Sequence, residues 1–358
     1  MSDLDAFIDK VVGPGRFRVE DDFGNGFVRL RVSEAERRQA KQDIRCVEDA
    51  VVEMLRNARD AHAKTIFLAM SRSGDRRTIA VIDDGDGIPS EMQDVVFEPR
   101  VTSKLDSFSE DEWGVHGRGM ALYSIRENAE EARVCASLPG KGSALRVSFL
   151  VSAVKERKDQ STLPTLASDG DRRWILGPGP RNIARAAAEF ALHARHRCTL
   201  YCGSPVEVAA TLRAYGMRFS EPSAIGASPA EDAPFAARLS FCRDAVDFSS
   251  CAEKLGLSVS QRSAYRILQG DVSPLKPLLG ILRDASSAPG SVEEAPFPRD
   301  CDARGLKIAS DDREAFVDAL KKAWAPLAEA YYLDAEVEPS VRVSRDGVRV
   351  TFPACKQL

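Results

Sequence analysis

The sequence predicts an α/β (α+β) protein: a compact α/β domain over residues 1–152, followed by mixed α/β and helical regions. Three observations lead to this prediction. Apolar side chains recur at helical spacing between residues 43 and 62. Two stretches, 64–83 and 132–151, each contain two apolar runs around a short turn with glycine, which is typical of paired strands. Residues 153–172 are charged, polar and marked by Pro and Gly, and therefore predict a linker.

Local patterns indicate the elements of the first domain. Residues 1–40 are polar and contain glycines at turn positions, which predicts a strap leading into the first helix. That helix carries apolar residues along one stripe, from Ile44 to Ala58. A second helix is expected to start at Met120, after a glycine-rich turn. The strands are expected at 64–71, 77–83, 132–138 and 144–151.

The second half of the chain predicts smaller units. Residues 173–232 are expected to form a small α/β segment, and residues 233–290 a helical segment. Residues 301–358 are expected to form a helix and a C-terminal β-hairpin. In this last segment Ser310 can cap the helix, and Asp346-Gly347 can turn two strands with alternating valines.

Composition and charge exclude several classes of protein. The 358 residues carry 50 Lys and Arg against 54 Asp and Glu, and 44% of them are hydrophobic. A disordered chain and a broadly basic nucleic-acid coat are therefore excluded, although a local basic patch is not. We expect a cytoplasmic protein with no membrane partner, because no run of about 18 apolar residues and no secretory signal is present. Eight scattered cysteines fit reduced thiols.

A polar stripe on the first helix is the first indication of a site. Glu53, Asn57 and Asp60 fall on one narrow face, opposite the apolar stripe. Taken alone, such a stripe is more typical of a helix face in contact with water. Three further patterns in the same domain favour a functional interpretation.

These three patterns are turns that contain glycine. Asp83-Asp84-Gly85-Asp86-Gly87 follows a strand, and its glycines let the backbone turn sharply and approach a ligand. Gly114-Val115-His116-Gly117-Arg118-Gly119 precedes a helix, where successive backbone N–H groups suit a polyphosphate. Lys141-Gly142-Ser143 precedes a strand and could place a hydroxyl near the sheet. Each pattern alone is weak.

In this order and spacing the four patterns resemble the GHKL ATPases, which include gyrase B subunits, Hsp90-type chaperones, sensor histidine kinases and MutL. Glu53-x-x-x-Asn57-x-x-Asp60-Ala61 is similar to the N-box of the family. The glycine turns are similar to its two glycine boxes, and Gly142-Ser143 to its usual Gly-Thr. The resemblance covers about residues 43–150 and implies a Bergerat-type α/β sandwich that binds ATP.

The resemblance implies a Mg²⁺-dependent ATP site. Glu53 would polarise the attacking water as general base, and Asn57 would hold the Mg²⁺ that bridges the phosphates. Asp83 would accept the adenine amino group, and the second glycine box would cradle the phosphates. Residues 97–119 would form a lid over ATP. The other expected nucleotide contacts are Asp60, Gly85, Gly87, Thr102, Ser103, Lys104, Gly114, His116, Gly117, Arg118, Gly119, Met120 and Ser143.

Some details depart from the family or specify a branch of it. Thr102-Ser103-Lys104 resembles the lid of MutL and of the type VI topoisomerase B subunit, so Lys104 is either a phosphate contact or a solvated lid lysine. Asp84 stands where many members have Asn, and Ser143 where Thr is usual. His116 occupies a variable position of the family, where it either packs the lid or takes part in catalysis.

The lid and Glu53 favour the ATPase branches over the histidine kinases. The first histidine, His62, lies inside the N-box helix, and about 40 residues before that helix are too few for a phosphorylatable hairpin. In the ATPase branches ATP closes the lid and joins two subunits, which implies a homodimer on ATP binding, with DNA or a DNA-processing protein as client. The alternatives are a protein kinase acting in trans, a non-hydrolysing ATP sensor, and an ATP-gated DNA-binding regulator.

Residues 251–268 look like a helix-turn-helix. The alanine, the turn glycine and the next apolar residue lie at the expected offsets. Arg262, however, occupies a place where an apolar core residue is usual, and the second helix is offset by about two residues. Any DNA contact would use Arg262, Arg266 and Lys254 or Lys276. The alternative is a helix pair that packs a small core.

One cluster has the residue types of a metal site. His193-x-x-His196-x-Cys198-x-x-x-Cys202 could bind zinc in a reducing compartment. Its short spacings do not match a known zinc finger, and cysteines of this kind are also common as small core residues.

Overall fold

The computed structural model of the chain describes residues 19–24, 26–102, 109–111, 114–116, 119–168, 174–218, 233–287, 310–330, 333–344 and 347–353. The chain divides into two compact units. The first unit comprises residues 1–156 and 186–281, and the second comprises residues 157–185 and 282–358.

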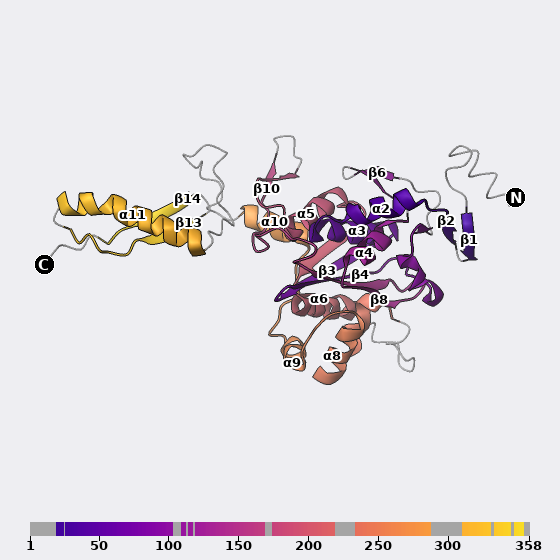
Figure 1. The fold of residues 1–358 in the computed structure, drawn as a ribbon. Helices are drawn as coiled ribbons and strands as arrows, with labels where there is room; N and C mark the ends of the chain where they lie inside the picture. The colour runs from indigo at the N-terminus through magenta and orange to yellow at the C-terminus, as the bar shows by residue number, and fades with distance from the viewer. Residues whose placement is uncertain are drawn as a thin grey trace. The chain divides into compact units, whose positions relative to one another are not determined.

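A five-stranded mixed sheet forms the centre of the first unit (Figure 1). Its strand order is β12-β3-β4-β9-β8, with β12 parallel to β3 and the other neighbours antiparallel. Four of these strands agree with the strands predicted from the sequence, which confirms the α/β fold class. The strands are β3 (Thr65–Ser73), β4 (Arg76–Asp83), β8 (Glu131–Ser137), β9 (Ser143–Leu150) and β12 (Thr199–Gly203).

Helices α2 (Glu34–Asp43), α3 (Val47–Asp60) and α4 (Ala121–Asn128) lie on one side of the sheet (Figure 1). The predicted apolar stripe of α3 is buried, including Val51 and Leu55, which have no exposed surface. Helix α2 occupies part of the region expected as a strap. It buries only Ala40, so periodicity gives no sign of it; its local signal is the capping box of Ser33 and Glu36.

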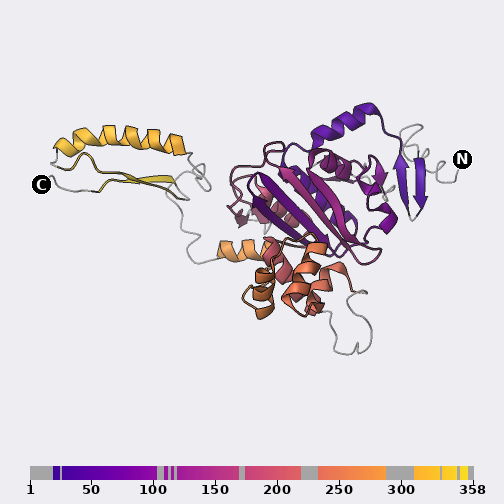
Figure 2. The same ribbon diagram turned by 60° about the horizontal axis from the view of Figure 1, so that its bottom comes forward.

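A second layer covers the other face of the sheet (Figure 1 and Figure 2). Helix α6 contacts β3 and β12, and the 3-10 helix η3 contacts β4. Phe67 and Ile82 of the sheet share one core with Phe235 and Phe248 of this layer. Because both faces are covered, β4 and β9 are buried along most of their length rather than at alternate residues. The layer consists of α6 (Pro205–Met217), η3 (Phe235–Phe241), α8 (Ala245–Lys254) and α9 (Gln261–Gln269).

The second layer and β12 come from the part of the chain that follows the predicted linker. From the sequence, residues 173–232 and 233–290 are expected to form separate segments that follow the first domain. In the structure, β12 pairs along its whole length with β3, from Thr199 beside Thr65 to Gly203 beside Ala69. Backbone pairing of this kind has no local sequence pattern, because any strand offers the same N–H and C=O groups.

Smaller elements surround the lid region of the first unit. A three-stranded sheet joins β1, β2 and β5, and a buried cluster of Met92, Val96, Phe97 and Val101 supports it. Strand β6 pairs with β7. The bounds are β1 (Val19–Gly24), β2 (Phe27–Leu30), η1 (Ser90–Met92), η2 (Val95–Phe97), β5 (Val101–Thr102), β6 (Ser109–Asp111) and β7 (Gly114–His116).

The second unit contains the predicted C-terminal helix and hairpin. Trp324 of its helix stacks on Phe352 with ring centroids 4.6 Å apart. Among the described residues, no helix has the length and apolar character needed to cross a membrane. The remaining elements of the chain are β10 (Leu166–Ser168), β11 (Trp174–Leu176), α5 (Ile183–His193), α10 (Leu278–Ser287), α11 (Ser310–Ala330), β13 (Ser340–Ser344) and β14 (Gly347–Thr351).

The shared core predicts that the second layer unfolds together with the sheet. Phe248 of α8 has no exposed surface, so Phe248→Ala should lower the free energy of unfolding by about 3–5 kcal/mol. Urea denaturation followed by circular dichroism measures this loss. Val246→Ala on the same helix is the control, because Val246 is 60% exposed and its loss should cost less than about 0.5 kcal/mol. A separate early transition for Phe248→Ala would contradict a common core.

Candidate functional site

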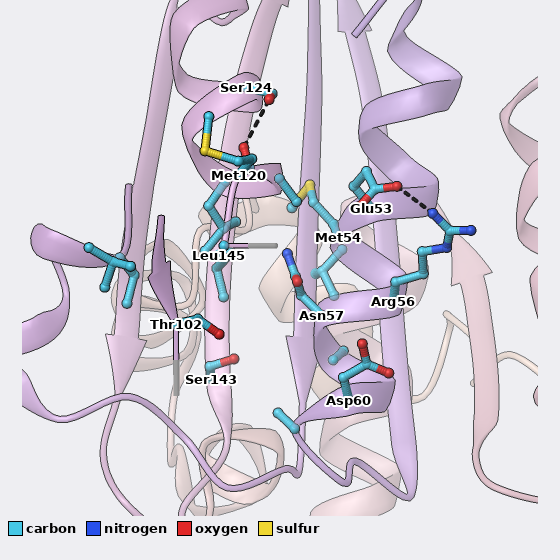
Figure 3. A pocket seen from close by; sticks show the side chains of 18 of the residues that line it. Glu53, Met54, Arg56, Asn57, Asp60, Thr102, Met120, Ser124, Ser143 and Leu145 are labelled. Carbon is cyan, nitrogen blue, oxygen red and sulfur yellow. Dashed lines mark hydrogen bonds and ion pairs between the residues drawn. The ribbon is translucent and has the colours of Figure 1, made fainter. Parts of the chain in front are cut away.

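A cavity of about 870 Å³ opens in the first unit between α3, α4 and the sheet (Figure 3). This volume lies in the range of pockets that bind small molecules. The cavity has a polar side on α3 and an apolar base formed by residues such as Met54, Val81 and Leu145. The sequence-predicted site residues among its lining are Glu53, Asn57, Asp60, Asp83, Gly87, Thr102, Gly119, Met120 and Ser143.

The polar stripe of α3 faces this cavity, as the spacing predicts. Glu53, Asn57 and Asp60 all line it, and Figure 3 shows Asn57 pointing from α3 toward the middle of the pocket. The Nδ2 atom of Asn57 is buried and has no hydrogen-bond partner among the described residues. Buried polar atoms are normally satisfied, so this amide fits a site completed by a ligand.

Arg56 is a member of the site that the sequence analysis does not identify. Its guanidinium Nη1 lies 2.6 Å from Oε1 of Glu53, and its side chain is only 5% exposed (Figure 3). A buried arginine needs a negative partner, and here the partner is the predicted general base. The sequence signal that could identify Arg56 is a charged residue that directly follows the apolar position Leu55 on this helix.

Asp83 ends β4 as a carboxylate with 2% of its surface exposed. Its Oδ1 accepts the backbone N–H of Gly85 at 2.8 Å, and its Oδ2 accepts the hydroxyl of Ser143 at 2.5 Å. The register of β4 and β9 sets Asp83 directly opposite Ser143. Burial raises the pKa of Asp83 to about 6, against the lowering effect of the Ser143 and Gly85 hydrogen bonds.

The first glycine box brings the backbone close to its neighbours. Gly87 has φ +76°, and a Cβ there would lie 2.0 Å from the carbonyl oxygen of Leu138. The adjacent Asp86 donates its N–H to the carbonyl of Ala61 at the end of α3, at 2.8 Å. Gly85 is also packed against Ala61, although it does not line the cavity. A side chain at Gly85 or Gly87 is thus excluded, because the backbone of this turn lies against Ala61 at the end of α3 and against Leu138 after β8.

Asp84, the departure from the usual Asn, links the site to the second layer. Its Oδ1 accepts the N–H groups of Lys64 and Thr65, each at 2.7 Å. Its Oδ2 accepts the hydroxyl of Tyr215 on α6 at 2.9 Å. Burial raises the pKa of Tyr215 to about 12, so this hydroxyl stays protonated near neutral pH and donates a hydrogen bond to Asp84.

Part of the predicted lid lies within the described residues. Gly119 and Met120 precede α4 and line the cavity, and Thr102 reaches it from β5. The carbonyl of Gly119 accepts the N–H of Arg100 at 2.8 Å, which joins the two ends of the lid. Gly114 and His116 belong to β7. Ser103, Lys104, Gly117 and Arg118 lie outside the described residues.

No protein-only metal cage is found in the part of the chain that the structure describes. No group of three or more His, Cys, Asp and Glu side chains there is arranged to hold a metal, including the predicted zinc ligands from His193 to Cys202. Burial raises the pKa of the Cys202 thiol to about 12, which disfavours the thiolate form that binds zinc. A Mg²⁺ ion held by one amide oxygen and by phosphates remains compatible with Asn57.

Residues 42–153 match the model of the histidine kinase-, DNA gyrase B- and HSP90-like ATPase family. This match contains the whole polar stripe, both glycine boxes and Ser143. It confirms the resemblance inferred from the four sequence patterns.

The same region is similar to several proteins named DNA mismatch repair protein MutL. The Thermus thermophilus protein is 42% identical over 86 residues, which cover 23% of this chain and 15% of the relative. The protein of Lactiplantibacillus plantarum is 42% identical over 83 residues, covering 22% of this chain and 12% of the relative. This chain thus spans less than a sixth of these relatives. A solved structure of full-length ShkA with AMPPNP shares 17% identity, covers 48% of this chain and 40% of its own, and has a TM-score of only 0.22.

The pKa of Asp83 predicts how nucleotide binding depends on pH. Both carboxylate oxygens already accept hydrogen bonds, and a proton would remove one acceptor needed for the adenine amino group. Because this pKa is raised to about 6, affinity should be full near pH 7 and fall about tenfold by pH 5. Calorimetric titration with a non-hydrolysable ATP analogue measures this.

Asp83→Asn is the control for this pH effect, since the amide keeps an acceptor oxygen but does not titrate. This variant should bind the ATP analogue more weakly at pH 7. It should also lose the part of the affinity change between pH 5 and pH 7 that comes from Asp83. An identical pH slope in the wild type and in Asp83→Asn would assign the effect to the nucleotide itself.

Proposed function

Because residues 42–153 form a domain of the histidine kinase-, DNA gyrase B- and HSP90-like ATPase family, we propose that this chain binds Mg·ATP in the cavity and hydrolyses it to drive a conformational switch. The observation that carries the proposal is the arrangement of the cavity. A polar stripe with Glu53 and Asn57 lines the same pocket as the buried carboxylate Asp83.

The two ends of the cavity suit the two ends of ATP. Asp83 and the apolar side chains of Val81 and Leu145 suit adenine, which presents an amino donor and flat apolar faces. At the other end, Gly119 leads into α4, whose N-terminal N–H groups suit phosphates. When bound, Mg²⁺ would neutralise phosphate charge, with the oxygen of Asn57 as its protein ligand.

Glu53 is the proposed general base. It would take a proton from a water molecule as the water oxygen bonds to the γ-phosphorus and the bond to the β,γ-bridging oxygen breaks, which yields ADP and phosphate. Arg56 is the proposed positioning residue, because its ion pair restrains the Glu53 carboxylate on α3. The carboxylate would still be accessible to water, since 24% of the Glu53 side chain is exposed.

The lid is the proposed moving part of the switch. Arg100, at its base, has φ +58° and is bonded through its backbone to Leu30 of β2 and to Gly119. A nucleotide phosphate bound at Gly119 would therefore influence the positions of β5 and β2 through these backbone hydrogen bonds. We propose that lid closure joins two copies of the chain. The similarity of the ATPase region to DNA mismatch repair proteins supports DNA processing as the purpose of this cycle.

The proposed chemistry predicts the effect of removing the base. Glu53→Gln cannot accept a proton, so steady-state phosphate release from Mg·ATP should fall at least about 100-fold. The dissociation constant for ATP should stay within about twofold, because Glu53 does not contact adenine in this proposal. Glu131→Gln, which changes an exposed carboxylate on β8, is the matched control and should leave both values unchanged.

The other outcomes of this assay separate the alternatives. ATP binding without turnover in the wild type would favour an ATP sensor. Transfer of the labelled γ-phosphate to a partner protein would favour a kinase acting in trans. If the wild type binds no ATP, the nucleotide site itself must be given up.

The ion pair to Glu53 predicts a separate effect for Arg56. Arg56→Met should lower kcat about 10- to 100-fold while the dissociation constant for ATP changes less than about twofold, because Glu53 loses its restraint. Arg56→Lys keeps the charge and should recover part of kcat. Single-turnover hydrolysis separates this effect from product release, and circular dichroism checks the fold. Equal kcat values for Arg56→Met and the wild type would remove Arg56 from the mechanism.

A further inference from the structure

Helices α8 and α9 form a helix-turn-helix pair in the second layer. The turn between them, residues 255–260, contains Gly256 with φ +79°. Helix α9 is capped at its start by the hydroxyl of Ser260 and ends at Gly270, which has φ +85°. Both ends of α9 are therefore fixed by local capping signals.

The buried side of this pair sets the orientation of α9. Ala252, Leu255 and Leu257 pack in the core beneath the sheet together with Ala264 and Ile267 of α9, and each is 2% exposed or less. In a common helix-turn-helix, the place of Arg262 is taken by an apolar core residue. The turn places the apolar position two residues later, at Ala264, so that Arg262 is exposed to solvent without leaving a gap in the core.

The opposite side of α9 is exposed and carries side chains that can form hydrogen bonds. None of the nine residues of this helix is acidic. Among the described residues, neither Arg262 nor Arg266 has an ion-pair partner, and Tyr265 is 59% exposed. The exposed residues of α9 are Gln261, Arg262, Tyr265, Arg266 and Gln269.

We propose that this face of α9 binds the major groove of duplex DNA. Arginine and glutamine hydrogen-bond to base edges, and both arginines also suit phosphates. A helix with its side chains is about 10–12 Å across and fits a groove about 12 Å wide. The major groove of A-form RNA is too narrow for a helix, so the structure favours DNA.

A protein partner fits this face less well. Tyrosine and arginine are also common in protein interfaces, but two arginines on a helix without acidic residues suit the uniform negative charge of a phosphate backbone better than a protein surface of mixed charge. The face also lies away from the nucleotide cavity. Val81 and Leu145 line the cavity, whereas their strand neighbours Ile82 and Ala144 pack in the core that holds α9. DNA on α9 would therefore leave the cavity open to ATP.

Fluorescence anisotropy of the full chain with a labelled 30-base-pair duplex of mixed sequence, without nucleotide, tests the proposal. The Arg262→Ala/Arg266→Ala double variant should bind at least about tenfold more weakly at 50 mM salt. The slope of log K against log salt should also fall by about 2, because two phosphate-binding charges are lost. Both side chains are exposed, so the variant should keep its fold and its affinity for ATP.

Arg195→Ala/Arg197→Ala is the matched control, since it removes two exposed arginines after α5. It should bind the duplex within about twofold of the wild type. The proposal is overturned if the wild type does not bind the duplex, if both double variants weaken binding equally, or if RNA of the same sequence binds as tightly as DNA. None of these results depends on ATP hydrolysis, so the proposed ATPase can fail while this interface stands.

Discussion

The hydrogen bonds of Asp83 bring together three parts of the chain that the rest of the site depends on. A buried carboxylate is costly unless donors satisfy it, and here the donors come from Gly85 in the next turn and from Ser143 on a neighbouring strand. The Ser143 hydroxyl reaches it only because β4 and β9 pair in one register. That register also brings the turn before β9 against the backbone of the first glycine box, where Gly142 leaves no room for a side chain.

The sheet that carries this carboxylate is buried on both faces, and each face has its own role. One face supports α3 and the cavity, and the other supports the layer of α6, η3, α8 and α9. Asp84 connects the two faces of the sheet. It directly follows Asp83, whose carboxylate lines the cavity, and its own carboxylate accepts a hydrogen bond from the hydroxyl of Tyr215 on α6. A displacement of this turn on nucleotide binding would therefore reach α6 through a single hydrogen bond. Helix α6 in turn contacts α9.

Local patterns predicted the parts of the site whose geometry is local. The spacing of Glu53, Asn57 and Asp60 places them on one helical face whatever the helix packs against. The positive φ of Gly87 likewise belongs to its own turn. Arg56 was not predicted, since its importance arises from burial beside Glu53 and the sequence shows only one more charged residue on a helix. The role of Asp in place of Asn at position 84 depends on Tyr215, which only the tertiary structure brings beside it.

The sequence by itself determined the α/β class of the first domain, its four antiparallel strands, the N-box helix and the family resemblance over the ATPase region. These features follow from side-chain periodicity and backbone restrictions that act between near neighbours. Only the tertiary structure decided that β12 extends the sheet, that α6, η3, α8 and α9 cover its second face, and that Arg262 is exposed. Such features depend on which backbone edge and which apolar face find each other. Many segments of one chain offer similar edges and faces, and the choice is made by the packing of the whole core.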